Sequence, residues 1–413
     1  MTKGGRFLCI GQSMHRNRIL CFIVESPVGI WETEGINVEQ GGKIVDERSN
    51  KRIMDEMEET LVKLHHTFEE KLWTPYHSHD LHELLIQFTK NELSEIRKMY
   101  AITGVSQLNK TKLAEVLVNE IPARIPDKLS ILTNDAYALL LRVVNAAGRY
   151  PAGDVSSLMV SVLRDLGMVF PVVQDGMRLL IMPQEVLSVI ASEQSKELKR
   201  AIKRNTEWVE VVKGMLNMQG ALYAPQQYEH LENVMKEPFT EKIREVLHLV
   251  GLYDLNLEQG MFSWLHPGVE SELDIREAQM ERTDIEFYPF TKEQLKLAAN
   301  PRYVEKTPAV KQLSEFFRIL YEMKKEELDE TLNMIVGMMR VDIKFQFIMD
   351  ELGESIELPD GEEMTILIDL MMELHNTTRK WILKGHSPVG LREGYHQQKG
   401  RKGKVLNLKD YRK

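Results

Sequence analysis

The feature that most constrains the fold is a helix–glycine–hairpin pattern that occurs twice in the chain. In the first copy, an apolar helical stretch over 155–164 is followed by Gly167 and by two apolar runs within 168–182, which Asp175 and Gly176 separate. Asp-Gly between two apolar runs is a strong signal for a β-hairpin. Helix, glycine and hairpin form the second half of a winged helix, and the helical stretch 131–147 supplies the first half.

The second copy lies 84 residues later and keeps the same spacing. Self-similarity at a fixed offset indicates an internal repeat. We therefore predict tandem winged-helix-like units over 127–190 and 192–300; the alternative is two unrelated hairpins in a mostly helical protein. The matched positions are Gly167 with Gly251, Gly176 with Gly260, Met177 with Met261, and Pro183 with Pro267.

Charge is distributed unevenly along the 413 residues, which are enough for several domains. The chain carries −9 in total, but residues 1–52 carry +2 and the tail 392–413 carries +6, so that 53–391 carry −17. A body this acidic is no general surface for neutralising phosphates. Any contact with nucleic acid must be local or come from the tail.

Cysteine and hydropathy patterns favour a cytoplasmic protein. The two cysteines, Cys9 and Cys21, lie near the beginning of the sequence, which excludes a disulfide framework or a cysteine zinc site in the body. No apolar run reaches the length that a membrane span needs. Residues 1–52 lack helical periodicity, and we expect a disordered leader there, or a start of translation at Met54 instead of Met1.

A helix-start signal precedes a compact local pattern over 84–121. Thr89 and Glu92 are spaced as a capping box, and Phe88 precedes them as a hydrophobic staple. An extended segment over 102–108 then leads to a second helix capped by Asn109. This helix–extended–helix unit resembles the N-terminal domain of the Rho termination factor and, more broadly, the SAP fold. The residues that carry the resemblance are Leu93, Glu95, Ile96, Gly104, Val105, Leu108, Lys112, Leu113 and Leu117.

The resemblance implies contact with nucleic acid and a link to transcription termination. In Rho the RNA-contacting surface belongs to a barrel that follows this domain, whereas residues 123–165 here are predicted to be helical, so its binding residues have no counterpart. SAP-like units bind DNA through basic residues, which acids nearly balance in this unit. The basic candidates here are Lys90, Arg97, Lys98, Lys110 and Lys112.

Further basic candidates follow outside this unit. Arg164 lies on the second helix of the first winged-helix-like unit, and Arg178 lies on its hairpin. A dense cluster with Lys196 occupies a helix predicted over 192–217, where flanking glutamates favour ion pairing over a phosphate-facing stripe. The other cluster members are Lys199, Arg200, Lys203 and Arg204, and the tail adds Lys399, Arg401, Lys402 and Lys404.

The remaining chain is predicted to be helical. Pro122 and Pro126 suggest a linker, and Thr291 with Gln294 forms a second capping box. Four apolar-periodic stretches over 308–388 predict a C-terminal helical bundle. Its last part, 376–388, is similar to a C-terminal segment of uncharacterised Gram-positive bacterial proteins, which often end in a cysteine zinc motif that this chain lacks.

No catalytic or cofactor motif is present in the sequence. There is no nucleotide-binding loop, nucleophile elbow or zinc-protease signature, and we predict neither catalysis nor a cofactor. His77, His79 and His82 are candidate metal ligands, but ligation needs convergent geometry, and a solvated helix cap accounts for them better.

These patterns predict a mainly α fold with short β-hairpins, with five parts: residues 54–122, the two winged-helix-like units, the bundle and the basic tail. We expect a non-enzymatic, nucleic-acid-associated regulatory protein linked to transcription termination, whose partner is DNA or RNA. The alternative is an adaptor that uses the same parts to bind a protein partner. Neither hypothesis places the chain in a membrane.

Overall fold

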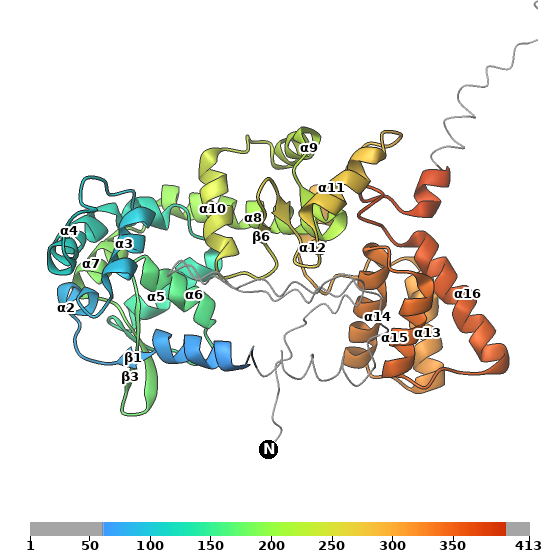
Figure 1. Ribbon diagram of the computed structural model, residues 1–413, viewed down its shortest axis with the longest axis horizontal. Helices are drawn as coiled ribbons and strands as arrows, with labels where there is room; N and C mark the ends of the chain where they lie inside the picture. Colours follow the sequence, from blue (N-terminus) through green and yellow to red (C-terminus); the bar gives the residue numbers. More distant parts are fainter. Residues whose placement is uncertain (1–59, 61, 394–413) are drawn as a thin grey trace, which may run out of the picture. The chain divides into compact units, whose positions relative to one another are not determined.

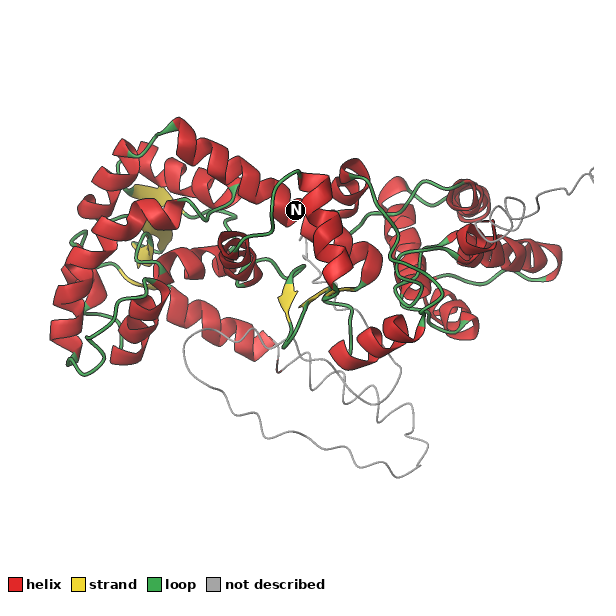
Figure 2. Cartoon of the chain, turned by 90° about the horizontal axis from the view of Figure 1, so that it is seen from above, coloured by secondary structure: helices red, strands yellow, loops and turns green. Residues whose placement is uncertain are grey.

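The computed structural model describes residue 60 and residues 62–393, and the expectations for 1–52 and for the tail beyond residue 393 lie outside this part. The protein is mainly α-helical with short β-hairpins, as the sequence predicted (Figures 1 and 2). It forms two compact units. Unit 1 comprises residues up to Thr206 with Glu241–Leu255, and unit 2 comprises Glu207–Thr240 with Asn256 onward. The predicted domain boundaries remain predictions.

Unit 1 begins with the predicted helix–extended–helix pattern. The capping box at α3 is confirmed: the Thr89 hydroxyl accepts a hydrogen bond from the Glu92 N–H at 3.2 Å, and the Glu92 carboxylate accepts one from the Thr89 N–H at 2.7 Å. Asn109 caps the next helix, and the stapling pair Phe88 and Leu93 is buried. The elements are a helix over 62–72, β1 (Thr74–Pro75), α2 (Leu81–Leu85), α3 (Lys90–Met99) and α4 (Lys110–Leu129).

The predicted linker at Pro122 and Pro126 is wrong, because both prolines lie inside α4. Each proline removes one backbone hydrogen bond and costs about 3 kcal/mol in a helix interior. The helix continues because burial of its apolar face outweighs this cost. The buried face consists of Leu113, Ala114, Leu117, Ile121, Ile125 and Leu129.

A small sheet follows in unit 1, and its predicted hairpin is confirmed. Strands β3 and β4 pair antiparallel from Phe170↔Ile181 to Gln174↔Met177, and the strand order is β1-β3-β4-β2. The turn between them places Asp175 at φ +51° and Gly176 at φ +75°, the positive angles that a type I′ turn needs. The elements are α5 (Asn134–Asn145), β2 (Arg149–Pro151), α6 (Ser157–Asp165), β3 (Phe170–Gln174), β4 (Met177–Ile181) and α7 (Gln184–Ser192).

The second copy of the pattern has the same strand pairing. Its first strand pairs with the last, in the order β5-β7-β6, just as β2 pairs with β4 in the first copy. The second copy differs by an additional helix, α9, which lies between β5 and α10, whereas no helix lies between β2 and α6 in the first copy. The elements are α8 (Lys196–Gln219), β5 (Ala221–Leu222), α9 (Pro225–Met235), α10 (Glu241–Gly251), β6 (Glu258–Gln259), β7 (Trp264–Leu265) and α11 (Glu272–Glu281).

The C-terminal helices have the predicted apolar periodicity. They enclose a core that includes Leu313, Phe317, Ile335 and Met371, each fully or almost fully buried. The capping box of Thr291 and Gln294 is also confirmed. The elements are α12 (Lys292–Ala298), α13 (Pro308–Tyr321), α14 (Lys325–Arg340), α15 (Phe345–Ser355) and α16 (Gly361–Thr377).

Helix α8 approaches α12 closely at Gly214, where a Cβ atom would overlap the carbonyl of Leu295. We expect Gly214→Ala to destabilise unit 2 by roughly 1–3 kcal/mol. The backbone of Leu295 would have to move to make room for the new methyl group, and backbone moves less easily than a side chain. The matched control is Gly337→Ala in α14, where a Cβ would meet nothing within 4 Å. The control should stabilise the helix by about 0.5–1 kcal/mol. Thermal unfolding measures both; equal effects would contradict the close packing.

Candidate nucleic-acid interface

The clearest basic surface of unit 1 is a line of cations on the first half of α8. We call Lys196, Lys199, Arg200 and Lys203 the α8 basic stripe. Residues spaced by three and four lie on one face of a helix, and seven residues span about 10 Å. All four side chains are exposed, whereas Leu198 and Ile202 on the opposite face are buried.

The stripe has no acidic partner, contrary to the ion pairing expected from the sequence. Among the described residues, no carboxylate lies within 4 Å of its four cations. Three of the four flanking glutamates are bound elsewhere: Glu207 pairs with Lys292 at 2.9 Å and Glu210 with Lys296 at 3.2 Å, and Glu193 accepts a hydrogen bond from the Ser195 hydroxyl. The fourth, Glu197, is exposed and forms no ion pair within the described residues. Proximity in sequence therefore predicted the wrong partners.

Two polar residues fix this part of α8 in unit 1. The buried Asn205 amide donates to the carbonyls of Ser130 and Leu132, each at 2.9 Å. The Thr206 hydroxyl accepts a hydrogen bond from the Asn134 N–H, at the beginning of α5. The stripe thus lies on a rigid support, which lowers the entropic cost of binding a ligand.

Arg164 on α6, a predicted DNA contact, is instead part of the interior. Its guanidinium pairs with Glu92 at 2.6 Å and lies 4.1 Å from the centre of the Phe88 ring. Burial would raise the pKa of Glu92, but hydrogen bonds from Arg164 and Thr89 outweigh burial and hold that pKa below its usual range. Arg164 therefore joins α6 to α3.

Arg178 on the hairpin has a similar structural role. It pairs with Glu69 at 2.6 Å and lies over the Trp73 ring at 4.9 Å. Burial would raise the pKa of Glu69, but hydrogen bonds from Ser157 and Arg178, with the positive charge of Arg178, hold it below its usual range. The hairpin is thereby joined to the first helix.

The remaining predicted residues divide into two groups. In the helix–extended–helix unit Lys90, Lys110 and Lys112 are exposed and have no ion-pair partner among the described residues. By contrast, Arg97 donates to the Ile102 carbonyl and Lys98 pairs with Glu95 at 2.7 Å. Arg204 is half-buried and donates to Asn205, while Lys399, Arg401, Lys402 and Lys404 lie outside the described residues.

The candidate metal ligands do not converge. His77 and His79 are exposed, and the His79 ring packs edge-on against Tyr76 with 5.3 Å between ring centres. Within residues 62–393, no group of three or more histidine, cysteine, aspartate or glutamate side chains could hold a metal ion. The structure therefore gives no support to a metal site at His77, His79 and His82.

Comparisons with known proteins do not add to this geometry. No protein-family model, curated protein or solved structure matches the chain. None of the described helices combines the length and apolarity needed to cross a membrane.

The cluster around Arg164 makes the stability of unit 1 depend on pH. Burial raises the pKa of Asp165 to about 6, against about 3.9 in an unfolded chain. Between these two pKa values the folded state keeps the Asp165 proton, whereas the unfolded state has lost it. The free energy of unfolding therefore falls as pH rises from the lower value to the higher one. We expect Asp165→Asn to increase the free energy of unfolding near pH 7.5 by on the order of 3 kcal/mol, which raises the melting temperature. Near pH 4 the substitution should change stability little.

Thermal unfolding at both pH values measures this difference. Asp329→Asn, at an exposed position on α14, serves as the control and should change stability little at either pH. An effect of Asp165→Asn that is the same at both pH values would contradict the assigned titration.

Proposed function

We propose that the protein is a non-enzymatic, nucleic-acid-associated regulatory protein, and that it binds the phosphate backbone through the α8 basic stripe. The observation that carries this proposal is the alignment of four exposed cations without an acidic partner on one rigid helix face. No ion pair within the protein has to break before these side chains bind phosphates. The release of counterions from the nucleic acid then favours binding.

The same geometry favours binding that is independent of base sequence. A winged helix that reads DNA uses the exposed face of its second helix in the major groove. Here Arg164 of α6 and Arg178 of the hairpin are bound to Glu92 and Glu69. Contacts to phosphates position a protein without specifying a sequence, so we expect similar affinities for unrelated sequences.

The link to transcription termination is part of this proposal and comes from the resemblance of the helix–extended–helix unit to the Rho domain. Fold analogy alone does not establish a function. The exposed Lys90, Lys110 and Lys112 of this unit would supply additional contacts to phosphates.

An adaptor function is the second candidate, and exposed apolar side chains at both hairpin turns favour it. Met177 at the β3–β4 turn is 58% exposed, and Met261 and Phe262 at the β6–β7 turn are 81% and 63% exposed. Glu272 fixes the second turn by accepting hydrogen bonds from the N–H groups of Met261 and Phe262. Ordered, exposed apolar side chains are typical of protein contacts.

Charge reversal of the stripe tests the first candidate. We expect the triple substitution Lys199→Glu, Arg200→Glu, Lys203→Glu to weaken binding of labelled duplex DNA and single-stranded RNA at least tenfold. The slope of log affinity against log salt should fall by about 2–3, because each lost phosphate contact removes about 0.9 from it on duplex DNA. Fluorescence anisotropy at about 50 and 200 mM salt, with and without residues 394–413, measures both quantities.

The matched control reverses three exposed lysines of unit 2, Lys311, Lys324 and Lys344, and so makes the same change in net charge. It should retain most of the binding. Equal losses in both variants would assign the effect to net charge and reject the stripe. Absence of binding by the unmodified protein at low salt would reject the nucleic-acid function and favour the adaptor.

A further inference from the structure

Unit 2 exposes a group of large apolar side chains on the β6–β7 turn and on the adjoining helix α11. We call Met261, Phe262, Leu273 and Met280 the α11 surface. These side chains are 81%, 63%, 61% and 62% exposed, respectively. Single exposed apolar residues are common on protein surfaces, whereas a group of them is typical of a surface that contacts another molecule.

One carboxylate holds the turn against the beginning of α11. Glu272 accepts hydrogen bonds from the N–H groups of Met261 and Phe262, at 2.8 and 3.0 Å, and from the Ser263 hydroxyl at 2.6 Å. Burial would raise the pKa of Glu272, but these hydrogen bonds outweigh burial and hold that pKa below its usual range. The exposed side chains of the turn therefore stand on an ordered support.

Arg276, one helical turn after Glu272, also joins the turn to α11. Its guanidinium lies 5.5 Å from the centre of the Phe262 ring and 3.6 Å from the Glu272 carboxylate. Residues three, four or seven positions apart share a helix face, so Leu273 and Met280 lie beside Arg276 on the exposed side of α11. The apolar side chains of α11 thus flank the face on which the turn rests.

The chain around this surface is strongly acidic. Residues 270–286 contain seven acidic side chains and two arginines, which give a net charge of −5. On α11 itself Asp274, Glu277 and Glu281 are exposed, and they have no ion-pair partner among the described residues. The α11 surface therefore presents apolar side chains within an excess of negative charge.

This charge selects among the possible occupants of the surface. Nucleic acid and anionic lipid would be repelled. A symmetric contact with a second copy of the chain would bring two equally acidic surfaces together, which is also unfavourable. A complementary partner carries lysine or arginine around an apolar centre. In a helix this pattern places apolar residues at i, i+3, i+4 and i+7 and basic residues on the flanks.

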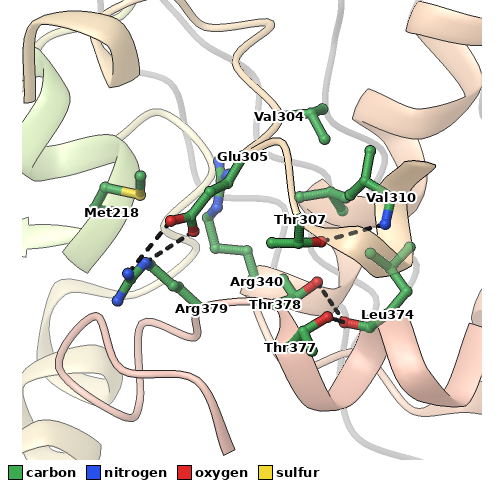
Figure 3. Close-up of a pocket in the computed structure, with 11 residues that line it drawn as sticks. Met218, Val304, Glu305, Thr307, Val310, Arg340, Leu374, Thr377, Thr378 and Arg379 are labelled. Atoms are coloured by element: carbon green, nitrogen blue, oxygen red, sulfur yellow. Dashed lines mark hydrogen bonds and ion pairs between the residues drawn. The ribbon is translucent and has the colours of Figure 1, made fainter. Parts of the chain in front are cut away.

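A cavity inside unit 2 is a weaker candidate for binding a partner. Glu305, Thr307 and Thr378 are among its lining residues, and its volume of about 20 Å³ is the space of one water molecule (Figure 3). Glu305 is already bound there to Arg379, at 2.9 Å. A side chain of a partner does not fit into this space, whereas the α11 surface is open to solvent.

We propose that the α11 surface binds a basic amphipathic helix of a partner protein. The apolar side of that helix would cover Phe262, Leu273 and Met280, and its basic side chains would pair with Glu277 and Glu281. Leu273 and Met280 are seven residues apart, which is about 10 Å along α11 and matches two turns of a partner helix. This inference rests on the adaptor candidate, whose partner chemistry it names, and is independent of the α8 basic stripe.

Fluorescence anisotropy on the full chain tests this surface with a labelled peptide of leucine and lysine, whose leucines are spaced i, i+3, i+4 and i+7. The control probe is the same peptide with glutamate in place of lysine. The lysine peptide should bind, and salt should weaken its binding, because screening reduces the attraction between opposite charges. The glutamate peptide should not bind. Binding by both peptides, or by neither, would overturn the proposal.

Phe262→Ala with Leu273→Ala should weaken binding of the lysine peptide at least tenfold, because two apolar anchors are removed. The matched control, Ile319→Ala with Ile366→Ala, shortens two exposed apolar side chains of unit 2 outside this surface and should leave binding unchanged. Circular dichroism establishes that each variant is folded before its binding is compared. A folded Phe262→Ala, Leu273→Ala variant that binds as tightly as the unmodified protein contradicts the assigned surface.

Glu277→Gln with Glu281→Gln should weaken binding several-fold and reduce its salt dependence. Glu315→Gln with Asp369→Asn makes the same change in net charge at exposed positions elsewhere in unit 2 and should have little effect. Deletion of residues 394–413 should leave the affinity unchanged; much tighter binding would assign the surface to the chain's own tail and reject a partner protein. All variants should bind DNA and RNA as the unmodified protein does, which separates this result from the test of the α8 basic stripe.

Discussion

The packing of α8 in both units depends on buried asparagine side chains that bind the exposed carbonyls of neighbouring segments. In unit 1, Asn205 donates to the carbonyls of Ser130 and Leu132, directly after α4. In unit 2, Asn217 donates to the carbonyls of Ala298 and Asn300, at the end of α12. The last carbonyls of a helix lack intrahelical partners. An amide that binds carbonyls at and just beyond a helix end fixes the packing of a neighbouring helix more specifically than apolar contact does.

In unit 2 this amide also determines where a charge is buried. The Asn217 side-chain oxygen accepts from Arg340, and its backbone carbonyl accepts from the Trp381 indole N–H at 2.9 Å. Gly220 lies against the same indole, where a Cβ would approach the ring to 2.7 Å. Asn217 thus holds the Arg340 guanidinium inside unit 2.

Interactions between residues close in sequence were predictable, and those between distant residues were not. Apolar periodicity located the long helices, Asp175-Gly176 located the hairpin, and Thr89 with Glu92 located a helix start, because each signal lies within a few residues. The ion pair of Arg164 with Glu92 joins residues 72 apart, and that of Arg178 joins residues 109 apart. Sequence patterns do not reveal such partners, so both arginines looked available for DNA. The linker predicted at the prolines of α4 was wrong for the same reason. Burial of the helix against residues distant in sequence outweighed the local cost of a proline in a helix interior.

Long-range pairing also determines which cations remain for a partner. Arg164, Arg178 and Arg379 are bound to carboxylates of other elements, since a planar guanidinium can form several hydrogen bonds at once. Lysine and arginine side chains have no such partner where no other helix or strand packs against their face of the helix. The first half of α8 meets this condition, because Leu198 and Ile202 bury one of its faces and the glutamates that follow it, Glu207 and Glu210, are bound to α12. An acidic protein can thus retain a local basic surface. The lysines and arginines that have no ion-pair partner, rather than the total number of lysines, indicate where a polyanion would bind.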